Sequence, residues 1–225
     1  MISKVYNINH RLKTIAELVE EGSHVIDIGC DHAFLDIYLA QTKQNVFLIA
    51  SDNKKGPLEH AEANIRKYHL EDKIKVKLGD GVDPIESDTD TIVISGMGGL
   101  NIIGILKYKT SLYHQVDTLI LSPNNDVERV RKEVAHLGFY IVYEVLVEEN
   151  KFIYPILVWK RGKRKYCKQE LLFGPILLHN QDNLFLKYVR REKEMKEKLL
   201  SLLPKKYWMR KWQLKKELKI ISKII

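Results

Sequence analysis

Cysteine is scarce in this chain of 225 residues: only Cys30 and Cys167 are present, and they lie far apart in the sequence. Neither belongs to a Cys-x-x-Cys pair, and the histidines are scattered without the spacing of metal ligands. The sequence therefore predicts neither a disulfide framework nor a zinc site. We expect reduced thiols and no bound metal.

Long hydrophobic runs are also missing. No segment approaches the roughly 20 consecutive apolar residues that a membrane-spanning helix needs. Residues 1–9 lack the basic and then apolar layout of a secretion signal. We therefore expect no membrane partner and a cytoplasmic location.

Acidic residues are scarce in the C-terminal part only. Residues 1–160 contain 18 Lys and Arg against 23 Asp and Glu, whereas residues 161–225 contain 19 against 6. The surplus positive charge of the chain therefore lies entirely in its last part. Such asymmetry indicates a polyanionic partner, nucleic acid or anionic lipid. The alternative is a solvated basic surface that serves only solubility.

Residues 24–160 alternate short β-branched runs with longer amphipathic ones, which predicts a parallel sheet covered by helices. The expected strands are 24–28, 46–51, 74–78, 91–95 and 117–122, and the expected helices are 9–21, 57–69 and 126–137. Two further runs, 139–147 and 152–159, are too close for a crossover helix and should form an antiparallel hairpin. This layout resembles that of α/β, Rossmann-like class I methyltransferases, and it would place the first helix over the ligand edge of the sheet.

After residue 161 the strand signals stop and a helical pattern begins. Apolar residues recur at steps of three, four or seven in two groups: Leu184, Tyr188, Met195, Leu199 and Leu202, then Tyr207, Leu214, Leu218, Ile221 and Ile225. Those are coiled-coil steps, and Pro204 between the groups cannot continue the first helix. We expect a catalytic domain over 1–160 and an antiparallel, coiled-coil helical hairpin over 161–225.

The strongest local motif is Asp27-Ile28-Gly29-Cys30-Asp31-His32-Ala33, an apolar strand that runs into a turn with glycine and carboxylates. The turn after the first strand of a doubly wound sheet is where such folds bind a nucleotide. Asp27 or Asp31 can hydrogen-bond the ammonium group of a cationic ligand. A plain structural turn is the alternative.

Acidic turns follow the next two strands as well. Asp52 ends the second strand, where a carboxylate should accept both ribose hydroxyls of an adenosyl group. Asp80, in Gly79-Asp80-Gly81, follows the third strand within reach of an adenine ring. Each acid alone could be a turn former, but three in succession on one sheet edge indicate a ligand site.

Small and amide residues follow the last two parallel strands. Ser95-Gly96-Met97-Gly98-Gly99 leaves room for a second flat ligand beside the cofactor, with Met97 packed against one of the two. The alternative is a glycine-lined turn with Met97 as core filler. Asn124, in Ser122-Pro123-Asn124-Asn125-Asp126, is either a substrate contact or part of a helix cap.

Two other functions remain open on these residues. A nicotinamide-dependent oxidoreductase also requires an acid after the second strand. Against this function, the motif Gly-x-Gly-x-x-Gly is absent and the acidic turns would repel a pyrophosphate. A catalytically dead RNA-binding scaffold would not need its set of ligand-facing acids. The ligand that stabilises the protein distinguishes each of these two functions from a methyltransferase.

The motifs Asn9-His10-Arg11-Leu12, Asp27-Ile28-Gly29-Cys30-Asp31-His32-Ala33, Gly79-Asp80-Gly81 and Ser95-Gly96-Met97-Gly98-Gly99 resemble the TrmK family of bacterial tRNA (adenine-N1)-methyltransferases. The likeness spans nearly the whole chain. It implies S-adenosylmethionine as cofactor and N1 of adenine 22 of tRNA as methyl acceptor, with methylation of another RNA base as the alternative.

The resemblance also implies which residues form the cofactor pocket. Its lining would be Asp27, Gly29, Cys30, Asp31, His32, Asp52, Asn53, Asp80, Gly81, Gly96 and Met97, with His10 and Arg11 closing over it. Cys30 stands where many relatives should carry a small hydroxyl residue, and the nearly isosteric thiol should be tolerated.

Ring N1 of adenine has an in-plane lone pair, so its methylation requires mainly positioning. The product ring is cationic, and a nearby carboxylate or carbonyl would stabilise it; Asp31 and Asn124 are the candidate catalytic residues. N6 methylation is disfavoured, because no Asn/Asp-Pro-Pro-aromatic segment follows the fourth strand. Since N1 lies on the Watson–Crick edge, the base must be unpaired or flipped out.

The basic hairpin is expected to hold the RNA. Its candidate phosphate contacts are Lys187, Arg190, Arg191, Lys205, Lys206, Arg210 and Lys211. Tyr207, Trp208 and Trp212 lie among them and could stack on exposed bases, although Trp212 is expected in the hairpin core. We expect a monomer or a weak dimer.

Overall fold

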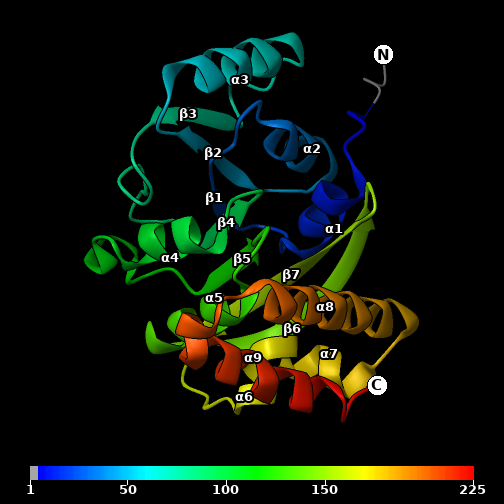
Figure 1. Ribbon diagram of the computed structural model, residues 1–225. Coiled ribbons are helices and arrows are strands. Elements are labelled where there is room, and N and C mark those ends of the chain that lie inside the picture. The colour runs from blue at the N-terminus through cyan, green and yellow to red at the C-terminus, as the bar shows by residue number, and fades with distance from the viewer. Residues whose placement is uncertain (1–4) are drawn as a thin grey trace. The chain divides into compact units, whose positions relative to one another are not determined.

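The N-terminal part of the protein is built on one mixed sheet, seen here in a computed structural model that describes residues 5–225 (Figure 1). The strands are β1 His24–Ile28, β2 Phe47–Asp52, β3 Ile74–Leu78, β4 Thr91–Ser95, β5 Thr118–Ser122, β6 Phe139–Glu149 and β7 Phe152–Arg161. Their spatial order is β3-β2-β1-β4-β5-β7-β6. The first five are parallel and β7 is antiparallel to β5. The predicted parallel sheet and hairpin are confirmed.

Helices cover both faces of this sheet. They are α1 His10–Leu18, α2 Phe34–Thr42, α3 Lys55–Lys67, α4 Gly99–Lys107 and α5 Val127–His136, with a short 3₁₀ turn η1 Thr110–Tyr113. Side chains of α1, α2 and α3 share a core cluster with Val25, Leu48 and Val93 of the strands. The helices α4 and α5 pack on each other over the opposite face, as in a doubly wound fold (Figure 1).

Two of these helices were not predicted from the sequence. The α2 segment buries Leu35, Ile37 and Leu39, and α4 buries Ile102 and Leu106. Because each helix is apolar around most of its circumference, its sequence has no regular polar face to reveal a helical period. The helix predicted over 9–21 ends earlier, at Leu18.

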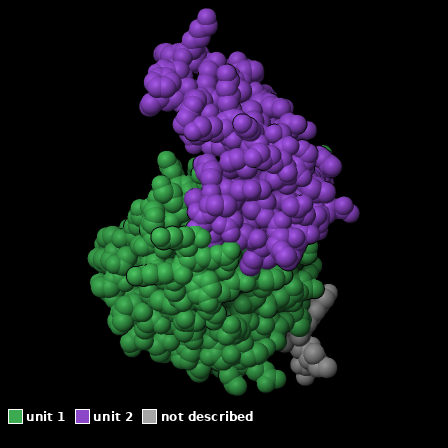
Figure 2. Space-filling view, turned by 90° about the horizontal axis from the view of Figure 1, so that it is seen from below, with its two compact units in different colours: residues 1–165 green, residues 166–225 purple. Residues whose placement is uncertain are grey.

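The chain divides into two compact units, residues 1–165 and 166–225, coloured separately in Figure 2. The first unit includes the residues that directly follow the sheet, because β7 runs to Arg161 and the Gly162 amide donates to the Gly138 carbonyl at 2.9 Å. The second unit is helical. Its elements are α6 Lys168–Phe173, α7 Pro175–Asn180, α8 Asn183–Leu202, the 3₁₀ turn η2 Lys205–Tyr207 and α9 Trp208–Ile221.

The predicted helical hairpin consists of α8 and α9, which pack on each other on either side of Pro204. Its predicted apolar seam is packed only in part. Tyr188, Leu214 and Ile221 are buried, whereas Met195 and Leu202, nearer the α8–α9 turn, are exposed. The expectation for Trp212 was wrong: its ring is exposed, with the Lys216 ammonium 3.5 Å from its centroid.

Glu217 on α9 is a buried acid in the second unit, whose net charge is positive. Its carboxylate lies 2.9 Å from the Lys196 ammonium on α8 and 3.7 Å from that of Lys168, and it accepts a hydrogen bond from the Gln213 amide. Burial acts to raise the pKa of Glu217, but the hydrogen bond and charge of Lys196, together with Lys168, outweigh it and lower the pKa. The acid therefore ties α9 to α8 and α6.

Replacing Glu217 with Gln is expected to destabilise the protein by about 1.5–3 kcal/mol, the usual contribution of hydrogen bonds to a charged group. Chemical denaturation monitored by helical circular dichroism at pH 7 measures the change. Glu194→Gln, on the exposed surface of α8, is the matched control and should change stability by less than about 0.5 kcal/mol. Equal effects of the two substitutions would contradict the assignment.

Candidate cofactor and nucleic-acid sites

The loop between β1 and α2 has a tightly constrained backbone. Gly29 has a φ of +82°, and Asp31 and Ala33 also adopt left-handed conformations at +50° and +55°. The amides of Gly29 and Cys30 both donate to the Ser51 carbonyl on β2, at 2.8 and 3.0 Å. The loop is therefore fixed at the carboxyl edge of the sheet, with the side chain of Asp31 exposed.

Met97 from the β4–α4 loop covers Gly29. A Cβ atom built on Gly29 would lie 2.2 Å from Met97 Cε, so only glycine allows this contact. Sequence reasoning expected Met97 to pack against a bound ligand or to fill the core; in the structure its half-buried side chain lies on the β1–α2 loop.

Replacing Gly29 with Ala is expected to weaken cofactor binding about tenfold, because the methyl group displaces Met97 and strains the left-handed backbone. Titration with S-adenosylhomocysteine measures the loss. Gly56→Ala is a suitable control, since no atom lies within 4 Å of a Cβ built there. Unchanged affinity of the Gly29 variant would show that the loop does not contact the cofactor.

The two acids that follow β2 and β3 lie at the same edge. Asp52 ends β2 half-buried, and its Oδ1 accepts a hydrogen bond from the Lys54 amide at 2.9 Å. The Asp52 carbonyl accepts from the Gly79 amide at 3.1 Å, which holds the β3 loop beside it. Asp80 is exposed, whereas Gly81 is buried with a φ of +55°. The second Asp52 oxygen thus remains for a ligand.

Asp27 differs from Asp52 and Asp80 because its side chain is buried. Its side chain is 5% exposed, and burial, followed by the charges of Asp36 and Asp52, raises its pKa well above the usual range. Sequence reasoning did not select Asp36, which lies on the first turn of α2 and is fully buried. A single acid inside the apolar run Phe34-Leu35-Asp36-Ile37-Tyr38 was the available signal. Cys30 is also buried, and burial and these acids raise the pKa of its thiol beyond its ordinary range.

Asn124 joins the loops that follow β4 and β5. Its amide nitrogen Nδ2 donates to the Gly96 carbonyl at 2.6 Å, and its backbone N–H donates to the Met97 carbonyl at 2.8 Å. Asn125 Oδ1 accepts from the Gly99 amide at 3.0 Å. A Cβ on Gly99 would lie 2.6 Å from the Asn125 carbonyl oxygen, so the small residues permit this close approach.

Arg11 does not reach outward from α1 but is buried beneath it. Its Nε donates to Ser122 Oγ at 2.9 Å, its Nη2 to the Ser122 carbonyl at 2.6 Å and its Nη1 to Asn124 Oδ1 at 3.0 Å. The guanidinium also lies 4.2 Å from the centroid of the Tyr154 ring. Arg11 thus positions the end of β5, a role that sequence reasoning missed because its partners are over 100 residues away.

The remaining predicted pocket residues lie around this edge. His10, at the start of α1, and Asn53, after β2, are exposed. His32 stacks on Phe34 with ring centroids 5.1 Å apart, and its backbone carbonyl accepts from Asn64 of α3 at 3.0 Å. The structure therefore brings the predicted cofactor residues to one edge of the first unit.

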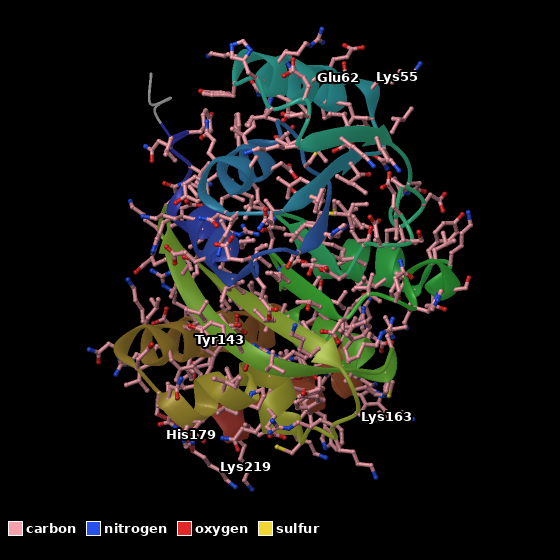
Figure 3. The ribbon with its side chains drawn as sticks, turned by 180° about the vertical axis from the view of Figure 1, so that it is seen from behind. Lys55, Glu62, Tyr143, Lys163, His179 and Lys219 are labelled. Atoms are coloured by element: carbon pink, nitrogen blue, oxygen red, sulfur yellow. The ribbon has the colours of Figure 1, made fainter. Side chains whose placement is uncertain are left out.

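The predicted RNA-binding residues all belong to the second unit. Lys187 and Arg190 are exposed on α8, where Arg191 is half-buried; Lys205 and Lys206 form η2, and Arg210 and Lys211 follow on α9. Exposed aromatic and apolar side chains lie among them, with Trp208 69% and Met209 66% exposed. The basic residues continue along α9 to Lys219, labelled in Figure 3.

The described residues 5–225 contain neither a metal centre nor a membrane-spanning helix. No group of three or more His, Cys, Asp or Glu side chains in that range could hold a metal ion. None of the helices described there is both long enough and apolar enough to cross a membrane.

The edge fits a cationic adenosyl ligand. Carboxylates follow β1, β2 and β3, where a sulfonium and an ammonium would find counter-charges, and glycines bring the backbone close. Together with the strand order, these features define a class I, S-adenosylmethionine-dependent methyltransferase.

Comparison with known proteins gives the family. Residues 25–223 match the model of the family described as TrmK, tRNA (adenine(22)-N(1))-methyltransferase. The Bacillus subtilis tRNA (adenine(22)-N(1))-methyltransferase is 32% identical over 187 residues, which are 80% of this chain and 79% of that protein. The chain therefore belongs to the TrmK family.

Two solved structures add the cofactor. Streptococcus pneumoniae Sp1610 in complex with S-adenosyl-L-methionine is 32% identical with a TM-score of 0.88, covering 97% of this chain and 99% of that one. M. capricolum TrmK in complex with S-adenosylhomocysteine is 25% identical with a TM-score of 0.84, covering 96% of each chain. The methyl donor of the family is S-adenosylmethionine.

Proposed function

We propose that this protein transfers a methyl group from S-adenosylmethionine to N1 of adenine 22 in tRNA, at the carboxyl edge of β1–β5. The observation that carries the assignment is the succession of acids after β1, β2 and β3 at one edge, beside the glycine loop Gly96–Gly99. When bound, S-adenosylmethionine supplies an electrophilic methyl group on a sulfonium.

Different residues at this edge bind different parts of the cofactor. Asp52 accepts from the ribose hydroxyls with the carboxylate oxygen that its turn leaves open. Asp80 and the neighbouring Gly81 backbone lie toward the adenine ring. Asp27 on β1 and Asp31 in the β1–α2 loop face the amino-acid part of the cofactor, where a carboxylate balances the ammonium.

Asp31 is better suited than Asn124 to stabilise the cationic product. Asn124 Oδ1 accepts from the Arg11 guanidinium, and its Nδ2 donates to Gly96, so its side chain is fixed next to a positive charge. A methylated adenine ring would be repelled by that charge. The exposed Asp31 carboxylate has the opposite sign. We therefore propose that Asp31 stabilises the positive charge of the methylated adenine. Asn124 instead holds the Gly96–Gly99 loop in place beside the substrate.

The second unit holds the tRNA in this proposal. The basic side chains of η2 and α9 neutralise phosphates, and the exposed Trp208 offers a face on which an unpaired base can stack. We further propose that the protein works in the cytoplasm as a monomer or weak dimer.

Incubation with isotope-labelled S-adenosylmethionine and bulk tRNA, followed by nuclease digestion, tests the assignment. The expected result is label in 1-methyladenosine only, and its loss from a tRNA with a different base at position 22. Label on N6 or on a small molecule would contradict the substrate. Stabilisation by NAD and not by S-adenosylhomocysteine in a thermal shift would instead favour an oxidoreductase.

A further inference from the structure

A fully buried carboxyl group lies on the first turn of α2, and none of the roles described above uses it. Asp36 is 0% exposed, and neither of its oxygens receives a hydrogen bond from another described residue. An ionised carboxylate in this position would lose its hydration without replacement. The group is therefore retained in its uncharged form unless a cation approaches.

The buried carboxyl group of Asp27 faces the helices that include α2. Asp27 lies two residues after Val25 on β1, and Val25 packs in the cluster that α2 shares with the sheet. Because side chains alternate along a strand, Asp27 points to the face that α2 covers. After burial, the charge of Asp36 is the largest contribution to the raised pKa of Asp27. Burial raises the pKa of Asp36 itself to about 7.

The other titratable groups around this pair do not neutralise it. Cys30, in the loop above, has a raised pKa, and Asp52 on β2 adds further negative charge. Arg11 of α1 is bound to Ser122 and Asn124.

Two more basic groups lie near the two ends of α2. The Lys73 ammonium donates to the Ala40 carbonyl, one turn further along α2 than Asp36. His32, before the helix, lies 3.7 Å from Asp31. The pair thus has acids for neighbours, while these basic groups are held by other partners.

We propose that Asp36 is a positioning residue for the cofactor: the two buried acids Asp27 and Asp36 together retain one proton while the site is empty, and the cationic cofactor displaces that proton to solvent. This inference rests on the proposed placement of the cofactor against the β1–α2 loop. S-adenosylmethionine carries an ammonium and a sulfonium against one carboxylate, so it arrives with net positive charge. Its arrival leaves both carboxylates ionised, and Asp27 accepts from the ammonium.

Proton displacement makes cofactor affinity depend on pH. For one proton bound with an apparent pKa of about 7, affinity for S-adenosylmethionine should rise about tenfold from pH 6 to pH 8. Asp36→Asn keeps the shape without the charge and should make this rise smaller than in the wild type, although burial still acts on Asp27 in the variant. Comparing the two proteins cancels the titration of the cofactor's own amino group.

Titration calorimetry at pH 7, in two buffers with different ionisation enthalpies, counts the released proton directly. The full-length wild type is expected to release a measurable fraction of a proton on binding S-adenosylmethionine, and Asp36→Asn a smaller fraction. Glu62→Gln is the matched control, because this acid lies exposed on α3 (Figure 3) and should leave proton release unchanged.

Thermal melting of the ligand-free proteins supplies an independent readout. The folded-state pKa of Asp36 lies above the unfolded value of about 3.9, so its burial costs stability as pH rises through that interval toward neutrality. The wild type should therefore lose melting temperature from acidic to neutral pH relative to Asp36→Asn. Asp36→Leu provides a second uncharged variant should the amide fold poorly.

The outcomes separate this inference from the proposed function. An affinity for S-adenosylmethionine that changes equally from pH 6 to pH 8 in wild type and in Asp36→Asn, or a variant that releases as many protons as wild type, overturns the role of Asp36. Failure of the wild type to bind the cofactor at any pH overturns the proposed function instead.

Discussion

Replacing Asp52 with Ala is expected to abolish measurable binding of S-adenosylmethionine while leaving tRNA affinity nearly intact. Asp52 ends β2 with one carboxylate oxygen used by the Lys54 amide and the other open to a ligand. If that oxygen accepts from both ribose hydroxyls, the loss is two charge-assisted hydrogen bonds, each contributing about 1.5–3 kcal/mol. This corresponds to a decrease in affinity of about 10²–10⁴-fold.

Calorimetry with S-adenosylhomocysteine and a filter-binding assay with tRNA measure the two affinities separately. Asp72→Ala removes an exposed acid that precedes β3 and should leave both unchanged. An unaltered melting temperature of Asp52→Ala would exclude loss of the β2 turn as the cause. Retained cofactor affinity in a folded Asp52→Ala protein would remove this acid from the site.

Replacing Lys205, Lys206, Arg210 and Lys211 together with Ala is expected to weaken tRNA binding about a hundredfold at physiological salt. Each phosphate contact that is lost should lower the slope of log affinity against log salt by about 0.7–0.9. These residues lie in η2 and at the start of α9, in the unit that carries the surplus positive charge. Cofactor affinity should not change, since the proposed cofactor residues belong to the first unit.

A charge-preserving variant is the control for this prediction. Replacing the three lysines with Arg should keep tRNA affinity within about twofold, because phosphate neutralisation depends mainly on charge. A salt slope that is the same in the Ala variant and in wild type would show that tRNA phosphates are bound elsewhere. The basic surface would then serve solubility.

The acids at the ends of β1, β2 and β3 could be predicted from the sequence, because their positions follow from a local pattern of residues. The runs at His24–Ile28 and Ile74–Leu78 show their strand character in their own residues, and the structure gives both strands the predicted bounds. Parallel strands place all their carboxyl ends at one edge. Any acid that directly follows such a strand therefore reaches that edge, as Asp52 and Asp80 do.

The contacts across the sheet could not be predicted in this way. The role of Arg11 depends on Ser122 and Asn124, more than 100 residues away, and no local pattern states which residues a buried guanidinium will meet. The helix α2 was missed for a related reason: its environment is apolar on most sides, so its sequence lacks the alternation that reveals a surface helix.

The sequence by itself determined the strands in their order along the chain, the acids at the strand ends and the concentration of positive charge after residue 161. Only the tertiary structure decided which acids are solvated and which are enclosed. Asp31 and Asp80 are exposed, whereas Asp27 on β1 and Asp36 on α2 are buried. The physical reason is that the free energy of a carboxylate depends on the solvent and charges around it, and folding supplies those surroundings from distant parts of the chain.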